Sequence, residues 1–438
     1  MKNKKIHIKT FGCQMNIYDS ERMLEAMKSE NYEAVENEEN ADLILLNTCH
    51  IREKAAEKVY SYLGRYKELK NKNFNLKIGV TGCVAQAEGK EIIKRQPLVD
   101  IVVGPQSYHN LPNILKNTQK GKKVVDTEFP IEDKFNILPP RSPVKRSVSS
   151  FLTVQEGCDK FCAFCVVPYT RGNEISRPVE DLLKETEKLV LEGAKEIILL
   201  GQNVNAYESS YNNKEFKLSN LIKEISKNKN LKRIRFTTSH PNDMTDDLIN
   251  IFGQEKKLMP YLHLPVQSGS DKILKLMNRK HTANKYREII KRLRDVREDI
   301  AISGDFIVGF PGETDDDFKE TLKLCDEIKY AHAFSFKYSS RPGTPASNKE
   351  EVNEKVKSRR LYELQERIIE NQKIFNESFL NNNVEVLIEK KGKKDNQLIG
   401  KSPHFQSIVL NGPIQLIGTT VRARILSHNI NTFLGEIL

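Results

Sequence analysis

Three cysteines in the middle of the chain form the pattern C-x3-C-x2-C: Cys158, Cys162 and Cys165. Three further cysteines precede them, each at the end of an expected β-strand: Cys13, Cys49 and Cys83. Three thiolates are one too few to complete a tetrahedral structural zinc site or a fully cysteine-ligated iron–sulfur cube. Each group of three therefore predicts a metal centre with an open coordination position, where chemistry can take place.

Net charge and hydropathy indicate which classes of protein this chain can belong to. The 70 Lys and Arg residues outnumber the 59 Asp and Glu residues, which gives a net charge of +11 that is compatible with nucleic-acid contact. The N-terminus lacks the apolar segment of a signal peptide, and no window approaches the roughly 18 apolar residues of a membrane span. We therefore expect a cytoplasmic protein without membrane contact, in which clustered cysteines bind metal and do not form disulfides.

Residues 1–120 alternate between strand-like and helical segments. Apolar runs at residues 6–13, 41–49 and 76–83 each end in a cysteine and are each followed by a helical segment. This alternation predicts an open parallel sheet, whose strands end along one edge where ligands bind. One cysteine at a strand end is more often a small buried apolar residue, but three at equivalent positions favour a shared metal site.

The remaining chain changes character twice. Residues 121–147 are rich in proline and predict a linker or an ordered crossing segment. Residues 148–375 alternate again and predict a partial or complete (β/α) barrel, with one long helix expected at residues 351–380. Residues 376–438 contain short strands and turns, which predict a small all-β barrel that binds nucleic acid or only caps the domain before it. The expected fold class is therefore α/β with a small C-terminal β-barrel.

The cysteine run differs from two common metal motifs. Bacterial ferredoxin loops have a shorter first gap and a fourth cysteine before proline, whereas the next cysteine here is Cys325, which we expect in an apolar helix face. A zinc ribbon needs two C-x2-C pairs, and only Cys162 and Cys165 form one. The remaining interpretation is a [4Fe–4S] cluster with one iron that no cysteine binds.

The run also carries Phe161 and Phe164 beside its second and third cysteines, and as a whole it resembles the radical S-adenosylmethionine superfamily. This resemblance implies that the free iron binds the amino and carboxylate groups of S-adenosylmethionine. It also implies that electron transfer from the cluster releases a 5′-deoxyadenosyl radical, so that the cofactor carries the difficult chemistry.

Other segments narrow the resemblance. TFGCQMNIYDS, NTCHIREKA and TGCVAQ resemble the extra N-terminal domain of the methylthiotransferases, whose three cysteines hold a second [4Fe–4S] cluster. RGNEISRP, GQNVNAY, RFTTSHP, HLPVQSGS and LMNRKHT resemble the branch that makes 2-methylthio-N(6)-isopentenyladenosine in tRNA. The all-β tail resembles the RNA-contacting TRAM domain, which is OB-like.

What this resemblance implies is a reaction at carbon 2 of an N(6)-isopentenylated adenosine at tRNA position 37, next to the anticodon. One S-adenosylmethionine would give its methyl group to sulfur on the N-terminal cluster, and a second would form the radical that activates the base carbon. The implied partners are the anticodon loop of tRNA, an electron donor and a sulfur or cluster supply system. We expect the chain to act as a monomer.

The expected cofactor pocket lies at the strand ends of the barrel. We expect Gln202 and Asn203 to contact the methionyl group. Ser239 and Gln267 are expected to contact the ribose or carboxylate. The turn with Gly309, Gly312 and Glu313 is expected to contact the adenine. Such Gly-Pro turns also occur for backbone geometry alone. Two alternatives stay open at this point: a related enzyme that acts on another modified adenosine or a ribosomal protein, and a non-catalytic iron–sulfur or zinc protein that binds RNA.

Overall fold

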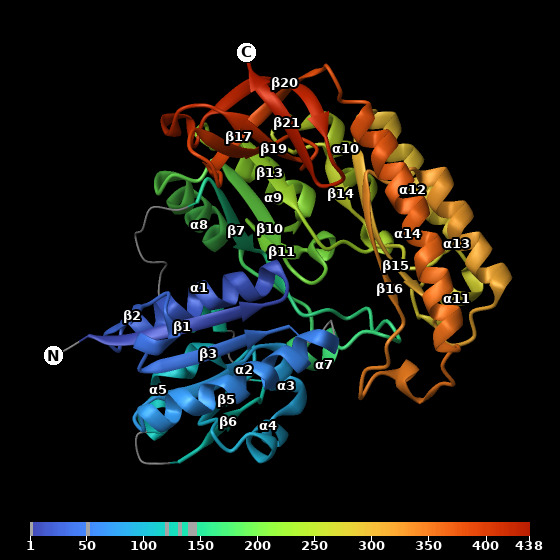
Figure 1. Cartoon of the computed structure of the whole chain (residues 1–438). Coiled ribbons are helices and arrows are strands. Elements are labelled where there is room, and N and C mark those ends of the chain that lie inside the picture. The colour runs from blue at the N-terminus through green and yellow to red at the C-terminus, as the bar shows by residue number, and fades with distance from the viewer. Residues whose placement is uncertain (1–2, 50–52, 119–121, 130–133, 139–146) are drawn as a thin grey trace. The chain divides into compact units, whose positions relative to one another are not determined.

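The computed structural model describes residues 3–49, 53–118, 122–129, 134–138 and 147–438, which fall into two compact units (Figure 1). Unit 1 comprises Met1–Pro143, Glu156–Asp159 and Cys165–Ile175. Unit 2 comprises Val144–Gln155, Lys160–Phe164 and Ser176–Leu438. Residues 50–52 of the motif around Cys49, and Pro130, Pro139, Pro140 and Pro143 of the proline-rich segment, lie outside the described residues.

Unit 1 contains a six-stranded parallel sheet in the order β2-β1-β3-β4-β5-β6, which confirms the open parallel sheet predicted from the sequence. Its strands are β1 (Lys4–Phe11), β2 (Tyr32–Ala34), β3 (Leu43–Thr48), β4 (Lys77–Thr81), β5 (Ile101–Val103) and β6 (Val124–Asp126). Its helices are α1 (Gln14–Lys28), α2 (Glu53–Lys72), α3 (Cys83–Glu88), α4 (Lys90–Arg95), α5 (Leu111–Thr118), α6 (Lys134–Ile137) and α7 (Val167–Arg171), with 3-10 helices η1 (Glu38–Asn40) and η2 (Tyr108–Asn110). β6 and α6 fall within the segment 121–147 that the sequence analysis assigns to a linker or crossing segment.

Both faces of this sheet are covered by helices. Ile44 and Leu46 pack with side chains of α2, α3 and α4, whereas Leu43 and Leu45 pack with side chains of α1 and α5. Successive side chains of a strand point to opposite faces, so a strand that is buried on both sides reads as a continuous apolar run. This explains why residues 43–46 show no polar alternation.

Unit 2 contains six parallel strands in chain order, split between the sheets β7-β10-β13 and β14-β15-β16. A parallel bridge between Ile234 and Leu258 continues the arrangement from one sheet to the next, which confirms the partial barrel. The strands are β7 (Ser149–Thr153), β10 (Glu196–Leu200), β13 (Arg233–Phe236), β14 (Tyr261–His263), β15 (Ala301–Val308) and β16 (His332–Lys337). The helices are α8 (Val179–Leu191), α9 (Leu218–Ser226), α10 (Asp246–Gln254), α11 (Asp271–Leu276), α12 (Ala283–Val296), α13 (Asp315–Ile328) and α14 (Glu354–Glu377).

Shorter elements lie between these strands and helices. They are β8 (Gln155–Glu156), β9 (Ile175–Ser176), the hairpin of β11 (Glu208–Tyr211) and β12 (Lys214–Lys217), and the 3-10 helices η3 (Val204–Ala206), η4 (Pro241–Asp243) and η5 (Pro345–Asn348). A further 3-10 helix, η6 (Ile414–Leu416), lies nearer the C-terminus. No helix in the described part of the chain is long and apolar enough to cross a membrane.

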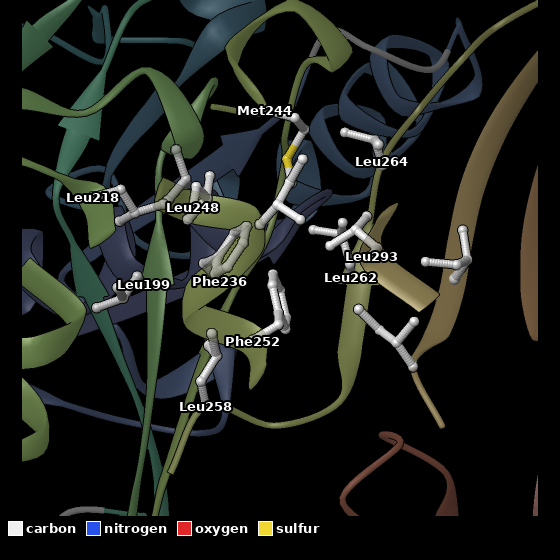
Figure 2. Close-up of a cluster of buried hydrophobic side chains, with 14 of the residues drawn as sticks. Leu199, Leu218, Phe236, Met244, Leu248, Phe252, Leu258, Leu262, Leu264 and Leu293 are labelled. Atoms are coloured by element: carbon white, nitrogen blue, oxygen red, sulfur yellow. The ribbon is translucent and has the colours of Figure 1, made fainter. Parts of the chain in front are cut away.

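Aliphatic and aromatic side chains fill the space between the strands of the partial barrel and its helices (Figure 2). Phe236 of β13 and Phe252 of α10 meet with ring centroids 5.8 Å apart, and Leu262 of β14 and Leu293 of α12 belong to the same cluster. Cys325 on α13 is also part of this core, with no exposed surface, in agreement with the sequence analysis.

The C-terminal part of unit 2 is a closed five-stranded barrel, drawn in red in Figure 1. Its strands are β17 (Asn383–Lys391), β18 (Gln397–Lys401), β19 (Ser407–Asn411), β20 (Thr420–His428) and β21 (Thr432–Ile437), in the order β17-β18-β19-β21-β20. It has its own apolar core, which includes Val386, Ile408 and Phe433. The expected small all-β barrel is therefore confirmed.

Two buried arginines of β13 attach this barrel to the partial barrel. Arg233 donates from Nη1 to the carbonyl of Lys401 over 2.7 Å. Arg235 donates to the carbonyls of Pro403, over 2.7 Å, and Ser402, over 2.8 Å, and pairs with Glu196 at 2.8 Å. Both arginines are almost fully buried, so loss of these carbonyl acceptors would leave guanidinium N–H groups unpaired.

The aromatic pair gives a stability prediction. Phe252→Ala should lower the free energy of unfolding of unit 2 by about 3–5 kcal/mol, because it removes a buried ring and leaves a cavity. Leu191→Ala is the control, because Leu191 ends α8 with 76% of its surface exposed and should change stability by less than about 0.5 kcal/mol. Urea unfolding followed by circular dichroism measures both, and equal losses would contradict the assignment of this core.

Candidate metal centres

The three N-terminal cysteines lie at the ends of three adjacent strands of the unit 1 sheet. Cys13 follows β1 and precedes α1, Cys49 follows β3, and Cys83 follows β4 as the first residue of α3. The structure brings them together: the side chains of Cys13 and Cys49 form a hydrogen bond, and the charge of Cys13 acts on Cys83. Residues separated by 36 and 34 positions in the chain thus share one sheet edge.

Two glycines allow this close approach. Gly12 has a φ of 120°, and a Cβ atom there would lie 2.3 Å from Cβ of Cys49. Gly82 has a φ of 83°, and a Cβ atom there would lie 2.5 Å from Oδ1 of Asn47. Any other residue would strain the backbone and push neighbouring loops apart. The loops can therefore pack this closely because a glycine precedes Cys13 and another precedes Cys83.

Two asparagines join the loops of the triad. The Cys13 thiol donates to Oδ1 of Asn16 over 3.2 Å, and Nδ2 of Asn16 donates to Oδ1 of Asn47 over 3.1 Å. Asn47 in turn donates from Nδ2 to the carbonyl of Asn16 over 2.8 Å. Both asparagines are fully buried. The sequence analysis did not single them out, although both lie within three residues of a motif cysteine.

The electrostatic environment favours metal ligation. The hydrogen bond to Cys49 and the charge of Arg171 lower the pKa of the Cys13 thiol to about 6, against the opposing effect of burial. Burial raises the pKa of Cys83, and Arg171 opposes that rise. A thiolate is the form that binds iron, so a depressed pKa of the exposed Cys13 thiol beside the buried Cys49 and Cys83 fits a cluster site.

Three thiols gathered at one sheet edge are a donor set of the kind that binds an iron–sulfur cluster. Within the described residues, no three His, Cys, Asp or Glu side chains are close enough together to hold one metal ion. A [4Fe–4S] cluster spreads its thiolates farther apart, because each thiolate binds a different iron. Three cysteines would leave one iron of such a cluster open.

The second group of cysteines lies in the loop between β8 and α7. The backbone N–H of Cys158 donates to the carbonyl of Gly172 over 3.2 Å, within unit 1. In unit 2, Sγ of Cys162 accepts a hydrogen bond from Nη1 of Arg279 over 3.4 Å. The backbone of Ala163 bonds to Met277 and Ala346, both over 2.9 Å, which fixes this part of the loop. Cys165 belongs to unit 1 and precedes α7.

The predicted cofactor residues of unit 2 lie where its parallel strands end. Gln202 and Asn203 follow β10, and their backbone N–H groups both donate to Oε1 of Gln155 over 3.0 Å. Asn203 also donates from Nδ2 to Asp243 over 2.8 Å, while its Oδ1 is buried with no hydrogen-bond partner in the described structure. The loop after β10 is therefore held rigidly and keeps a buried acceptor available for a ligand.

The next two strand ends are similar. Ser239 follows β13, and its buried hydroxyl also lacks a hydrogen-bond partner among the described residues. Gln267 follows β14 with a φ of 78°, held by backbone bonds to Asp305 and Ile307 of β15. Unsatisfied buried polar groups and unusual backbone angles cluster at ligand sites. These residues fit the polar end of S-adenosylmethionine, and their contact with it stays a prediction.

Glu313 supports the turn after β15. Its fully buried carboxylate accepts a hydrogen bond from the N–H of Gly309 and pairs with Arg360 of α14 at 2.9 Å. Gly309 and Gly312 have φ angles of 69° and 87°, as a tight turn requires. Glu313 thus shapes the turn through its protein contacts, and the approach of the turn to the adenine also stays a prediction.

Two histidines that the sequence analysis did not select lie in unit 2. The rings of His240 and His281 are 5.7 Å apart, and Nε2 of each is buried without a hydrogen-bond partner in the described residues. Burial strongly lowers the pKa of His240, and burial together with Arg279 lowers the pKa of His281 to about 4. Both are therefore neutral at neutral pH. They lie in the segments RFTTSHP and LMNRKHT, so the resemblance of these segments to the family could have indicated both histidines as site residues.

The chain was compared with known proteins and family models. Residues 5–104 match the model described as uncharacterized protein family UPF0004, and residues 152–325 match the radical SAM superfamily. A tRNA-2-methylthio-N(6)-dimethylallyladenosine synthase of Ruegeria sp. is 57% identical over 435 residues, which cover 99% of both chains. The enzyme of that name from Jannaschia sp. is 56% identical, covering 99% of this chain and 94% of its own. This chain belongs to the tRNA-2-methylthio-N(6)-dimethylallyladenosine synthase family.

Solved structures support the fold of this family member. The radical S-adenosylmethionine methyltransferase TsrM from Kitasatospora setae, bound to cobalamin and a [4Fe–4S] cluster, matches with a TM-score of 0.59 and 13% identity over 79% of this chain and 77% of that chain. The cobalamin-dependent radical enzyme OxsB matches with a TM-score of 0.55 and 14% identity over 84% of this chain and 56% of that chain.

The glycine before Cys83 gives a test of the N-terminal centre in this synthase-family chain. Gly82→Ala should lower the iron content of the anaerobically reconstituted protein by about half, because the added methyl group overlaps Asn47 and displaces the loop that carries Cys83. Gly64→Ala on α2 is the matched control, because its Cβ would meet no atom within 4 Å. Iron and sulfide are counted per chain, and an unchanged count for Gly82→Ala would contradict the packing argument.

Proposed function

We propose that this chain attaches a methylthio group to carbon 2 of N(6)-isopentenyladenosine in tRNA, at position 37 next to the anticodon. The observation that carries the proposal is the gathering of Cys13, Cys49 and Cys83 at one sheet edge, in a chain that also contains a radical SAM region. A radical enzyme that only cleaves S-adenosylmethionine has no need for a second cluster with an open iron. Transfer of sulfur does need one.

The residues of the chain divide into two ligand sets. Cys158, Cys162 and Cys165 would hold the cluster that binds S-adenosylmethionine, and the N-terminal triad would hold the cluster that carries sulfur. When bound, such clusters supply reductive cleavage of S-adenosylmethionine and a site for the transferred sulfur. A radical is required because the C2–H bond of adenine is neither acidic nor electrophilic enough for acid–base chemistry.

The strand-end residues of unit 2 would bind and shield the cofactor. Asn203 and Ser239 each present a buried oxygen that has no hydrogen-bond partner in the described part of the chain, which matches the ammonium or hydroxyl donors of S-adenosylmethionine. Gln202 follows β10 and Gln267 follows β14, and the turn at Gly309 allows close approach of the backbone. Exclusion of water by these buried groups protects a reactive radical.

The exposed cations of the C-terminal barrel would position tRNA. They are Lys390, Lys391, Lys393, Lys394, Arg422 and Arg424. Lys401 differs from these cations, because it is partly buried, donates to Ser407 over 2.7 Å and lies over the ring of Phe405. Burial also lowers the pKa of Lys401. The Lys401 ammonium group therefore interacts within the barrel, and we expect the six exposed cations to contact the phosphates.

The proposal also includes the oligomeric state, the location and the partners of the chain. We expect the chain to act as a monomer in the cytoplasm, with an electron donor for the first cluster and a sulfur or cluster supply system for the second. The C-terminal barrel would act as a TRAM module on the anticodon loop.

The two ligand sets predict separable activities. In the triple variant Cys13→Ala, Cys49→Ala and Cys83→Ala, about half the iron should be lost. Cleavage of S-adenosylmethionine should continue, and no methylthio product should form. Cys162→Ala is the reciprocal variant: 5′-deoxyadenosine should vanish while the N-terminal cluster remains.

Cys325→Ala serves as the control for cysteine loss, because its thiol is in the core and should leave both activities in place. Chromatography of 5′-deoxyadenosine and of tRNA nucleosides measures the two reactions. Loss of both activities in the triple variant, or of neither, would contradict two independent centres.

The barrel predicts a change in the salt dependence of tRNA binding. The triple variant Lys393→Gln, Lys394→Gln and Arg422→Gln should weaken tRNA binding and reduce the slope of log affinity against log salt by roughly 0.7–0.9 for each phosphate that the barrel no longer neutralises. Lys229→Gln, at an exposed position between α9 and β13, is the control. Point variants are preferable to truncation, because removal of the barrel would take away the carbonyl groups to which Arg233 and Arg235 donate. An unchanged slope would exclude the barrel as the RNA-binding module.

A further inference from the structure

Arg171 is buried in unit 1, although it belongs to the segment that follows the radical SAM cysteines. It is the last residue of α7, six positions after Cys165, and only 2% of its side chain is exposed. Nη2 donates to Oδ2 of Asp19 on α1 over 2.6 Å, and Nη1 lies 3.7 Å from Oε2 of Glu156. The carbonyl of Arg171 accepts a hydrogen bond from Gln106 over 2.8 Å, which fixes the end of α7.

The guanidinium faces the N-terminal triad. Its charge acts on both Cys13 and Cys83, and its side chain forms a hydrogen bond with the Cys83 thiol. α7 packs against α3, the helix that begins at Cys83. Nη1 is buried and lacks a well-formed hydrogen bond among the described residues, so the interaction of the guanidinium with Cys83 leaves this N–H group available to a further acceptor. A buried, unsatisfied cationic donor next to three cysteines indicates that an acceptor belongs there.

The other buried charges near Arg171 are already paired. Lys134 pairs with Glu156 at 2.6 Å, and both side chains are at most 2% exposed. Together with the pair of Arg171 and Asp19, this gives two cations and two carboxylates in a nearly solvent-free region. Three ligand thiolates and a bound sulfur would add negative charge, which a low-dielectric site tolerates only beside a cation with a free donor.

We propose that Arg171 is a positioning residue for the N-terminal cluster: its guanidinium donates hydrogen bonds to a sulfur of the cluster that Cys13, Cys49 and Cys83 would hold. This inference rests on the proposed function, because it takes that cluster as given. The acceptor is an anionic sulfur, either a ligand thiolate or the sulfur that is transferred. The segment that carries Cys165 would thus complete the environment of the other cluster.

The alternative is that Arg171 serves only to neutralise Asp19. The two roles differ in what a compensating change restores. Arg171→Met leaves a buried carboxylate unpaired, so it should destabilise the protein under either role. Adding Asp19→Asn removes that unpaired charge and should restore folding, but it does not return a cationic donor to the cluster.

The test uses the full-length chain with Cys162→Ala, so that only the N-terminal cluster gives a signal. Arg171→Met, Arg171→Met with Asp19→Asn, and Arg171→Lys are compared by iron content, thermal unfolding and an EPR-monitored redox titration. Loss of a cationic donor to sulfur should shift the midpoint potential to more negative values, because the reduced cluster carries more negative charge. We expect this shift in Arg171→Met and in the double variant, although the double variant regains its thermal stability. Arg171→Lys, which keeps the charge, should stay closer to the parent.

Restoration of the midpoint potential by Asp19→Asn, or an unchanged potential in Arg171→Met, would overturn the proposal. With Cys162 intact, the double variant should form methylthio product about 10–100-fold more slowly while 5′-deoxyadenosine formation continues. The proposed function is tested separately by the parent chain. If the parent forms no methylthio product while the potential still shifts, the function fails and the positioning role of Arg171 stands.

Discussion

The close approach of three loops at the end of the unit 1 sheet is the constraint on which the N-terminal centre depends. Parallel strands bring their carboxyl ends to one edge, but the contact between Gly12 and Cys49 is tighter than side chains normally permit. The paired carboxamides of Asn16 and Asn47 then hold the loops together through hydrogen bonds that water cannot reach. This framework of protein contacts holds the three cysteines at one sheet edge.

Both units contain a buried ion pair. The ion pair of Arg171 with Asp19 in unit 1 and that of Arg360 with Glu313 in unit 2 are both almost free of solvent. Apolar residues of similar size often stabilise a protein as well as such pairs do. Their presence is better explained by geometry: Glu313 shapes the turn at Gly309, and Arg171 brings a cation to the cysteines.

The sequence was sufficient for features that depend on local pattern. The strand ends that carry Cys13, Cys49 and Cys83 follow from alternating apolar and helical segments, and the small barrel follows from its turn residues. Long-range contacts could not be predicted in this way. Nothing in the pattern around Arg171 indicates that it meets Asp19, which lies 152 residues earlier. Lys401 could not be distinguished from its exposed neighbours, because its burial depends on Phe405 and Ser407 in the folded barrel.

The attachment of the C-terminal barrel has a consequence for its evolution. Arg233 and Arg235 bond to main-chain carbonyls of residues 401–403, and every amino acid provides such a carbonyl. The joint therefore depends in part on the path of the backbone, and the side chains of Glu385, Glu389 and Phe405 add contacts of their own to the partial barrel. Mutations of exposed residues outside these contacts can change the outer surface of the barrel without loosening its connection to the partial barrel.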